Sequence, residues 1–325
     1  MSSNLNNKVV FVTGGTGSFG RAFIKRTLEK AKPKKIIIFS RDEWKQSEMA
    51  KEFSHPSLRW FIGDVRDRNR LFRGMEGADI VIHAAALKQI PVCEYNPFEA
   101  IKTNVIGAEN VIDAAIDLGV KQVVALSTDK AVNPINLYGA TKLCAEKMFV
   151  QGNTYAATHK TRFSCVRYGN VVGSRGSVVP LFKEQREKGL LTITDKEMTR
   201  FWITLKESVD LVVTALTQMN GGEIFVPKIP SMKIVDLAQA MAPGVKVKDI
   251  GIRPGEKLHE TLITEDEAPY TWEFPSYYVI QPLFRWWGDG KEKKGKKVPE
   301  KFCYRSDTNK EWLKKKDLLD YLKNE

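Results

Sequence analysis

The sequence has few cysteines and no spacing that would pair them or let them hold a metal ion. Cys93, Cys144, Cys165 and Cys303 are widely separated, and none belongs to a CxxC pair. Disulfide frameworks and zinc sites use closely spaced cysteines, so we expect no metal site. Free thiols are typical of a reducing compartment. We therefore expect a cytoplasmic protein.

Long apolar runs and internal repeats are also missing. No run approaches the ~18 residues that a membrane-spanning helix needs, and residues 1–7 lack the apolar core of a signal peptide. The 325 residues include 42% hydrophobic and 28% charged residues, which is ordinary for a globular protein. We expect no integral membrane segment.

Negative charge is scarce relative to positive charge, and the net charge is +12. Much of the excess lies in two late basic runs, at 291–297 and 314–316. Neither accompanies a nucleic-acid-binding motif, so we expect no nucleic-acid partner. A basic surface also attracts anionic small molecules, and a loose attraction to anionic membranes remains an alternative. We also expect a homo-oligomer, of an order that the sequence does not specify.

A glycine-rich loop follows the first predicted strand, residues 8–13, and precedes a helix-like segment, 21–30. Its glycines have the spacing G-x-x-G-x-x-G. In a dinucleotide-binding loop the first permits a tight turn, the second lets the backbone approach a pyrophosphate, and the third allows close helix packing. The helix N-terminus then binds phosphate. We expect cofactor contacts from Gly14, Thr16, Gly17, Ser18, Phe19 and Gly20.

The second predicted strand, 35–39, ends without the acidic residue that usually binds the adenosine ribose. Ser40 and Arg41 stand there instead, and Lys45 follows one turn later. A serine and two cations suit a ribose 2′-phosphate. The pattern favours NADP over NAD, although Asp42 could still reach a ribose and the two cations could simply be solvated.

Further short apolar strands at 58–62, 79–84, 121–127 and 162–167 alternate with helices, including 96–118 and 136–158. This alternation predicts an α/β fold, a Rossmann-type doubly wound parallel sheet. His83, in an apolar run, is predicted to pack in the core, and Asp64 has helix capping as its alternative role. Residues at the strand ends and beyond are predicted to contact the cofactor: Asp64, Val65, Ala84, Ala85, Lys88, Leu126 and Ser127.

The predicted active site follows the fifth strand, where Thr128, Asp129 and Lys130 precede Tyr138 and Lys142. If Tyr138 begins a helix, it shares one face with Lys142, four residues later. A nearby ammonium favours phenolate, which would make the tyrosine a better proton acceptor near neutral pH. The cluster suits chemistry on an alcohol or a ketone.

The pattern becomes irregular after the sixth strand. We expect a mainly NADP-binding domain at 1–168, a smaller and mainly nucleotide-sugar-binding region at 169–282, between which the chain crosses, and a basic tail of unknown role at 283–325. A helix at 206–219 and a strand at 223–226 interrupt the second region. Arg175, Arg200 and Arg253 are separate cations that could converge on a diphosphate, or each could be an ordinary surface arginine.

Several stretches together resemble one family. They include TGGTGSFG, SRDEWKQSEMAKEF, HAAALK, LSTDKAVNPINLYGATK, RYGNVVGSRGSVVP, MTRFWIT and IGIRPGEKLHE. The chain resembles the extended short-chain dehydrogenase/reductases that act on nucleotide sugars. More closely, it resembles the inverting UDP-N-acetylglucosamine 4,6-dehydratases that open the pseudaminic acid pathway. The match runs from about residue 9 to 282, and the tail carries little of it.

The resemblance implies a lyase that removes water from UDP-GlcNAc and recycles NADP internally, giving UDP-2-acetamido-2,6-dideoxy-β-L-arabino-hex-4-ulose. Tyr138, with Lys142 on the nicotinamide ribose, would help take the 4-hydroxyl proton. Lys130 would remove the carbon-5 proton, and Asp129 would protonate the departing 6-hydroxyl. It also implies substrate contacts from Lys88, Asn170, Val171, Arg175, Val178, Thr199, Arg200, Arg253 and Glu256.

Three alternatives stay open at this point. A retaining dehydratase would keep the configuration at carbon 5, but retaining relatives carry Asp-Glu where this chain has Asp129-Lys130. A 4-epimerase would lose no water. A non-catalytic NADP-binding regulator would not need the intact catalytic positions. The charge of Lys130 is also open, because Asp129 favours the ammonium whereas burial and an oxidised nicotinamide favour the neutral amine.

Overall fold

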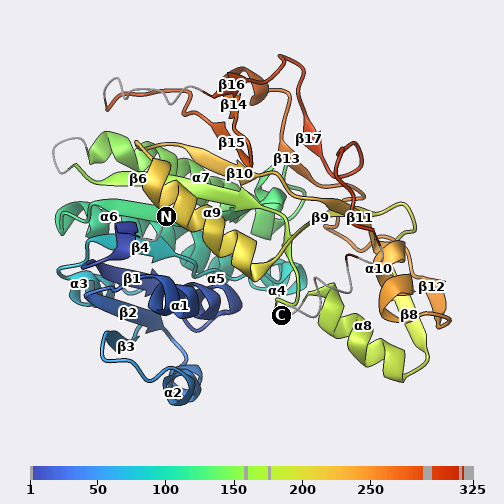
Figure 1. Ribbon diagram of the computed structural model, residues 1–325, viewed down its shortest axis with the longest axis horizontal. Coiled ribbons are helices and arrows are strands. Elements are labelled where there is room, and N and C mark those ends of the chain that lie inside the picture. The colour runs from blue at the N-terminus through green and yellow to red at the C-terminus, as the bar shows by residue number, and fades with distance from the viewer. Residues whose placement is uncertain (1–2, 157–159, 175–176, 288–294, 315–316, 318–325) are drawn as a thin grey trace.

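The computed structural model describes residues 3–156, 160–174, 177–287, 295–314 and 317. A single large sheet forms the centre of the molecule (Figure 1). Among the described residues it has ten strands in the order β16-β14-β15-β10-β6-β5-β4-β1-β2-β3. The segment from β3 to β10 is parallel, and β15, β14 and β16 extend it antiparallel. The strand order 3-2-1-4-5-6 within it is that of a Rossmann fold.

The strands of this sheet match the predicted ones closely. Buried β-branched residues fill β1 and β2, as expected for parallel strands covered on both faces. The parallel strands are β1 (Val9–Thr13), β2 (Lys35–Ser40), β3 (Leu58–Ile62), β4 (Ile80–His83), β5 (Gln122–Thr128), β6 (Arg162–Tyr168) and β10 (Ile224–Pro227). The antiparallel extension comprises β14 (Thr271–Glu273), β15 (Tyr277–Ile280) and β16 (Lys296–Lys297).

Helices cover the sheet in two layers, which confirms the doubly wound prediction (Figure 1). On one side α1 (Ser18–Lys30) packs beside α9 (Leu205–Gln218), and α2 (Glu43–Glu52) lies near β3. On the other, α6 (Gly107–Asp117) packs against both α3 (Arg68–Met75) and α7 (Leu137–Tyr155). No helix among the described residues is long and apolar enough to cross a membrane.

The helix predicted at 96–118 is interrupted. It consists of α5 (Pro97–Ile101), a π-helical turn η2 (Lys102–Ile106) and then α6, and the short α4 (Ile90–Tyr95) precedes it. In the π turn, Asn104 is buried and its amide donates to the Leu87 carbonyl at 2.9 Å and to the Thr141 hydroxyl at 3.0 Å. A π turn is a frequent feature of functional sites, and this one ties the loop after β4 to α7.

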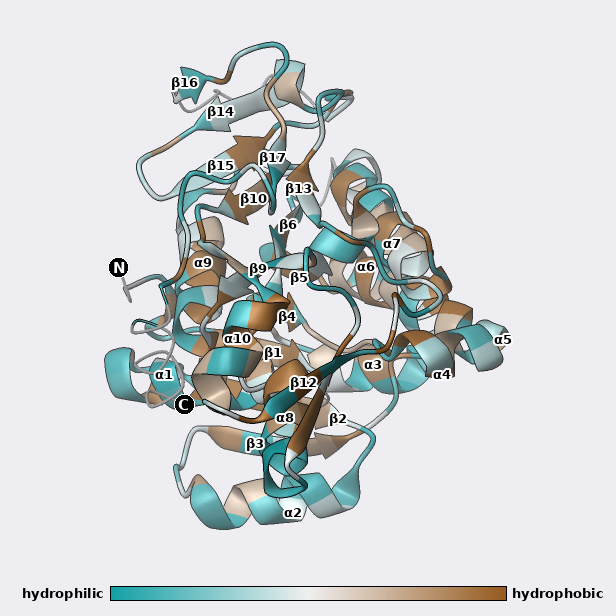
Figure 2. Cartoon of the chain, turned by 90° about the vertical axis from the view of Figure 1, so that its right-hand side faces the viewer, coloured by the Kyte–Doolittle hydropathy of each residue, from teal (hydrophilic) through white to brown (hydrophobic). Residues whose placement is uncertain are grey.

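A second apolar core lies beside the main one, and Figure 2 views the molecule from that side. Buried side chains such as Phe182, Leu191, Trp202 and Leu237 fill it. Along the chain, α9 and β10 lie between the elements that build this second core, but they pack with the main sheet. The chain therefore crosses between the two cores. The elements around it are β7 (Asn170–Val171), α8 (Val178–Glu187), β8 (Leu190–Ile193), β9 (Thr199–Ile203), β11 (Ser231–Lys233), α10 (Ile234–Met241) and β12 (Lys246–Asp249).

The C-terminal segment was expected only as a basic tail, yet its residues 295–314 fold back onto the molecule. β17 (Tyr304–Arg305) pairs antiparallel with β13 (Thr261–Ile263), and β16 pairs with β14. The buried Tyr304 hydroxyl donates to the Ile229 carbonyl at 2.8 Å. Most of both basic runs lies outside the described residues. Short 3₁₀ turns complete the fold: η1 (Ser3–Leu5), η3 (Asp129–Ala131) and η4 (Ala268–Tyr270).

Candidate active site

The glycine-rich loop lies between β1 and α1, where the strand order reverses. Gly14 has φ +65°, and a Cβ on it would come within 2.8 Å of the Ala85 nitrogen and 2.9 Å of the Ala84 carbonyl. A Cβ on Gly20 would lie 2.4 Å from the carbonyl oxygen of Gly15. The tight turn and the close approach of the helix are thus confirmed, although Gly20 packs against the loop rather than against the strand. The position is that of a dinucleotide site.

Other predicted contacts in this region come from both sides of the loop. Thr16 is buried, and Ser18 and Phe19 form the first turn of α1, for which Gly17 is the N-cap. Val65, also buried, accepts a hydrogen bond from the Asn110 amide at its carbonyl. Thr16, Ser18 and Phe19 therefore lie at the switch point of the sheet, whereas Val65 lies beside α6, and the contacts of these residues with a cofactor stay a prediction.

His83, at the end of β4, is a packed core residue, as predicted. It is 1% exposed, and its Nδ1 lies 2.9 Å from the Thr13 hydroxyl. Burial, and secondarily the charge of Lys142, lower its pKa to about 3. His83 is therefore neutral at physiological pH and is unsuited to act as a base there.

The predicted 2′-phosphate site at the end of β2 holds two cations that already have acidic partners. Arg41 lies 3.6 Å from Asp64, and Lys45 pairs with Asp42, the N-cap of α2. Ser40 is buried and accepts from the Gln46 amide at 3.1 Å. Because Arg41 and Lys45 are about half exposed, both can turn toward an anion.

Asp64 does not cap the next helix, so the capping alternative is wrong. The N-cap of α3 is Asp67, whose side chain accepts from the Arg70 nitrogen. Asp64 instead bonds Arg66, at 2.7 Å from Nη2. Burial raises the pKa of Asp64, but the bonds and charge of Arg66 outweigh it, so that the pKa is lowered.

The catalytic residues predicted from the sequence do come together at the end of β5. The Thr128 hydroxyl donates to Asp129 Oδ1 at 2.8 Å, and the Lys130 ammonium donates to the same oxygen at 3.0 Å. Asp129 is fully buried. Tyr138, on the first turn of α7, is also buried, and Thr128 and Lys130 are among the groups that affect the pKa of its hydroxyl. One carboxylate thus organises a hydroxyl and an ammonium beside a phenol.

The start of α7 lies directly against this turn. Asn136 caps the helix by accepting from the Gly139 nitrogen at 2.7 Å. A Cβ on Gly139 would lie 2.2 Å from the Lys130 carbonyl oxygen, so glycine permits this close approach. One turn later, the Lys142 ammonium donates to the Leu126 carbonyl at 2.7 Å. The shared face predicted for Tyr138 and Lys142 is therefore turned toward the end of β5.

The pKa values of Tyr138 and Lys130 bear on two expectations from the sequence, the activation of the phenol and the charge of the lysine. Burial raises the pKa of Tyr138 to about 12, and the cation that opposes this most is Lys130, not Lys142. A neighbouring ammonium does favour the phenolate, as expected, but it is that of Lys130 and its effect is smaller than that of burial. Burial also lowers the pKa of Lys130, but the charges of Asp129 and Glu260 outweigh it and raise the pKa. Lys130 is therefore a charged ammonium in the protein without substrate or cofactor.

The loop after β4 brings Lys88 to the same region. Ala84 and Ala85 donate to the Thr13 hydroxyl at 3.2 and 3.3 Å. Burial, and then the charge of Lys130, lower the pKa of Lys88, although the side chain keeps solvent access. The site thus contains two neighbouring lysines that repel each other, which favours an anionic ligand between them.

The sequence reasoning missed Glu260, the last residue of IGIRPGEKLHE. It is 2% exposed, and its carboxylate lies 3.5 Å from Lys130, 3.6 Å from Lys257 and 3.9 Å from Arg200. The Lys257 ammonium also donates to the Val132 carbonyl at 2.5 Å. The only sequence signal was an acidic residue at the end of a cation-rich turn, which does not by itself indicate contact with Lys130.

The predicted arginine cluster is not brought together by any described contact. Arg200 is buried, and its guanidinium donates to the carbonyls of Thr199, Lys257 and Leu258 at 2.7–3.1 Å. Arg253 is about half exposed and lies 3.6 Å from Glu256. Arg175 lies outside the described residues. A joint contact of these arginines with a diphosphate stays a prediction.

The other predicted substrate contacts border the second core. Asn170 and Val171 form β7, which pairs with β9, and Val178 begins α8. The Asn170 Oδ1 is buried without a hydrogen-bond partner among the described residues. The Thr199 hydroxyl, in contrast, already contacts His259 Nδ1 at 2.9 Å and Ser306 Oγ at 2.6 Å.

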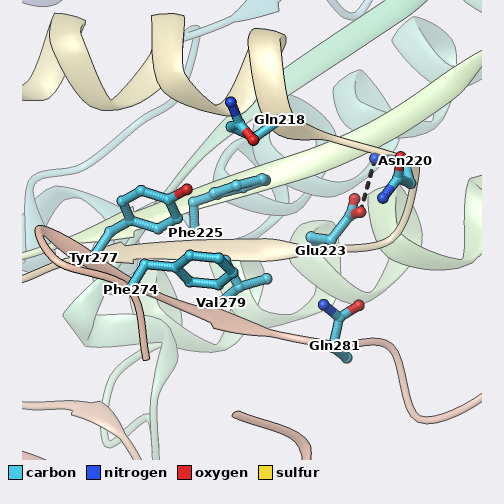
Figure 3. Close-up of a pocket in the computed structure, with 8 residues that line it drawn as sticks. All are labelled: Gln218, Asn220, Glu223, Phe225, Phe274, Tyr277, Val279 and Gln281. Carbon is cyan, nitrogen blue, oxygen red and sulfur yellow. Dashed lines mark hydrogen bonds between the residues drawn. The ribbon is translucent and has the colours of Figure 1, made fainter. Parts of the chain in front are cut away.

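A small pocket elsewhere on the sheet does not include this cluster (Figure 3). It lies between the end of α9 and the strands β10 and β15, and Glu223 accepts from the Asn220 nitrogen at 2.7 Å in its wall. Its volume of about 10 Å³ suits a single water molecule rather than a nucleotide.

Comparison with known proteins points to one family. The model of the polysaccharide biosynthesis protein family matches residues 10–282. The inverting UDP-N-acetylglucosamine 4,6-dehydratase of Campylobacter jejuni is 54% identical over 98% of each chain. A UDP-glucose 4-epimerase of Rickettsia canadensis is 45% identical over 84% of this chain and 83% of its own. The X-ray structure of Pen from Bacillus thuringiensis is similar with TM-score 0.90 and 38% identity, covering 99% of both chains.

The first relative is matched almost from end to end, beyond the range of the family model. The structural similarity likewise extends over nearly the whole chain and includes the C-terminal segment. The chain therefore belongs to the polysaccharide biosynthesis protein family, and within it to the group that includes the inverting UDP-N-acetylglucosamine 4,6-dehydratases.

Proposed function

We propose that this protein is an NADP-dependent UDP-N-acetylglucosamine 4,6-dehydratase that inverts carbon 5, a lyase placed to open pseudaminic acid biosynthesis. The observation that carries the proposal is the Asp129–Lys130 pair, a fully buried carboxylate 3.0 Å from a partly buried ammonium, next to Tyr138 and Lys142. A site that only oxidised the sugar would need no more than the tyrosine and the lysine. The added carboxylate–ammonium pair supplies an acid and a base for elimination.

The residues around the switch point fit a nicotinamide dinucleotide. Gly14 leaves no room for a Cβ beside Ala84 and Ala85, and the N-terminus of α1 offers donors to phosphate. The buried Ser127 hydroxyl has no hydrogen-bond partner among the described residues, so a ligand there would satisfy it. When bound, the cofactor would accept a hydride from carbon 4 of the sugar and later return it to carbon 6.

The chain's own groups would move the protons. Tyr138 takes the 4-hydroxyl proton, for which the positive nicotinamide would have to lower its raised pKa. Lys130 would first pass a proton to Asp129 across their 3.0 Å contact, which leaves a neutral amine to take the carbon-5 proton. Asp129 then gives the received proton to the departing 6-hydroxyl, which leaves as water, and the charged pair is restored. A proton added to carbon 5 from the opposite face completes the inversion.

Specificity for NADP is assigned to Arg41 and Lys45. Arg41 directly follows β2, where the common ribose-binding acid is missing, and Lys45 lies in the first turn of α2. Their present partners, Asp64 and Asp42, are partly exposed carboxylates, and surface ion pairs are weak. A 2′-phosphate carries more charge than either carboxylate and would compete with them for the two cations.

The test is turnover of UDP-GlcNAc by the cofactor-loaded enzyme in heavy water, followed by proton NMR. We expect loss of water, one solvent deuterium at carbon 5, inverted configuration and no net NADPH. Retained configuration would indicate a retaining dehydratase. Water-free isomerisation at carbon 4 would indicate an epimerase, the second candidate, which the Rickettsia relative favours. Cofactor binding without turnover would indicate a regulator.

A further inference from the structure

Glu260 is a buried carboxylate for which the proposed reaction has so far no role. It precedes β13, and its oxygens face the three cations Lys130, Lys257 and Arg200 at 3.5, 3.6 and 3.9 Å. Burying a charge is costly unless opposite charges accompany it. Glu260 therefore depends on these cations, and they depend on it for their position.

The C-terminal segment holds the backbone of Glu260 in place. The Glu260 nitrogen donates to Ser306 Oγ at 2.9 Å, and the Ser306 nitrogen donates to the Glu260 carbonyl at 2.9 Å. Ser306 is fully buried, and its hydroxyl also contacts the Thr199 hydroxyl at 2.6 Å. Antiparallel pairing of β13 with β17 continues from this contact, with Thr261 opposite Arg305. A residue 46 positions later in the chain thus fixes Glu260.

We propose that Glu260 is a positioning residue that holds Lys130 beside Asp129, and that Ser306 keeps Glu260 in register for this task. The inference rests on the proposed function, since it assigns Lys130 the role of carbon-5 base. At 3.5 Å the carboxylate attracts the ammonium without accepting a normal hydrogen bond. It can therefore hold Lys130 near the sugar while leaving its protons to Asp129.

The same geometry makes Glu260 a determinant of the charge of Lys130. The charged and titratable groups around that lysine are Asp129, Glu260, Arg200, Lys88 and Tyr138. Of these, the two carboxylates favour the ammonium. Removing the charge of Glu260 lowers the pKa of Lys130, so that the neutral amine is present at lower pH.

The first experiment measures the pH dependence of dehydration by the cofactor-loaded Glu260→Gln enzyme from about pH 7 to about pH 11, a range that reaches past the ordinary lysine pKa of ~10.4. We expect the acid limb of kcat to move down by about one pH unit. Maximal kcat should fall about tenfold, with KM changed less than about threefold, because an orientation is lost rather than a substrate contact. Glu260→Asp keeps the charge and should retain the wild-type limb with a reduced kcat.

Glu265→Gln is the matched control, because it removes the same charge from an exposed residue of the same segment. It should leave both the limb and kcat unchanged. The proposal is overturned if the limb of Glu260→Gln stays where the wild-type limb lies, or if Glu260→Asp and Glu260→Gln move it equally.

A second readout is independent of turnover and works even if the proposed reaction is wrong. The folded protein is treated at about pH 9 with a small amine-reactive ester, and mass spectrometry then measures the acylation of Lys130. Because only the neutral amine reacts, the labelling rate reports the deprotonated fraction of Lys130. We expect labelling of Lys130 to be several-fold faster in Glu260→Gln than in the wild type. Ser306→Ala should increase it in the same direction but less. Equal labelling in all variants would overturn the inference, whereas absent turnover by the wild type would overturn only the proposed function.

Discussion

The cofactor loop and the catalytic cluster lie on the same edge of one sheet but are built differently. The loop depends on backbone geometry, since Gly14 and Gly20 sit where any Cβ would meet main-chain atoms within 3 Å. The cluster depends on charge, since one buried carboxylate, Asp129, binds both Thr128 and Lys130. A steric change should therefore damage the first site together with the fold, whereas a change of charge should damage the second site alone.

The sharpest test of this contrast is Lys130→Ala. Removing a general base usually costs ~10²–10⁴-fold in rate, and we expect that loss in dehydration with the cofactor still bound. Oxidation at carbon 4 uses Tyr138 and Lys142, which remain, so some NADPH should still form together with a stalled 4-keto intermediate. Tyr138→Phe should instead block that first step. Single-turnover absorbance of NADPH, with NMR of the product, separates the two variants.

One result would show that another residue is the base. It is dehydration by Lys130→Ala at a near wild-type rate, with solvent deuterium entering carbon 5. The activity of the catalytic cluster would then not depend on the charge of Lys130.

The steric side of the contrast is tested by Gly20→Ala. The added Cβ would lie 2.4–2.6 Å from backbone atoms of Gly15, so α1 must move away from the loop. Overpacking of this kind typically costs about 1–3 kcal/mol of unfolding free energy. We expect a lower thermal midpoint together with weaker cofactor binding, measured by calorimetry.

Gly77→Asn is the control for this variant. Gly77 has φ +73°, and no atom lies within 4 Å of the position that a Cβ would occupy there. Asparagine tolerates that backbone conformation, so the substitution should change neither quantity appreciably. Unaltered cofactor affinity in Gly20→Ala would mean that the loop does not depend on its backbone fit.

The smallest expected effect concerns Arg41→Ala. A charged hydrogen bond to phosphate contributes about 1.5–3 kcal/mol, and solvent screening reduces it at a half-exposed side chain. We expect about tenfold weaker NADP binding with little effect on NAD, measured by titration of each cofactor. Lys51→Ala, an exposed cation on α2, should alter neither. Equal losses for NADP and NAD would show that Arg41 does not read the 2′-phosphate.

The local patterns in the sequence predicted the local parts of the site. Alternating strands and helices predicted the sheet, and a spacing of four residues predicted that Tyr138 and Lys142 share a face of α7. The glycine spacing predicted the turn at Gly14. Each of these follows from backbone periodicity or from the conformational range of glycine, which neighbouring residues specify.

Ionisation and long-range contacts were decided only by the tertiary structure. The pKa of Tyr138 rises because its burial outweighs the nearby ammonium of Lys130, and burial at that position cannot be computed from a spacing. Arg200 is buried and donates to main-chain carbonyls, which its sequence position did not indicate, and its contact with a diphosphate stays a prediction. Both outcomes depend on which groups surround a side chain, and these come from distant segments.

What the sequence by itself determined is therefore the parallel sheet, the turn before α1 and the order of groups along β5 and α7. What the tertiary structure decided is that Glu260 faces Lys130 and that Ser306, 46 residues later, holds it. The physical reason is that a short pattern constrains only its own backbone. Electrostatic partners are set by the packing of the whole chain, in which β13 and β17 meet beside the end of β5.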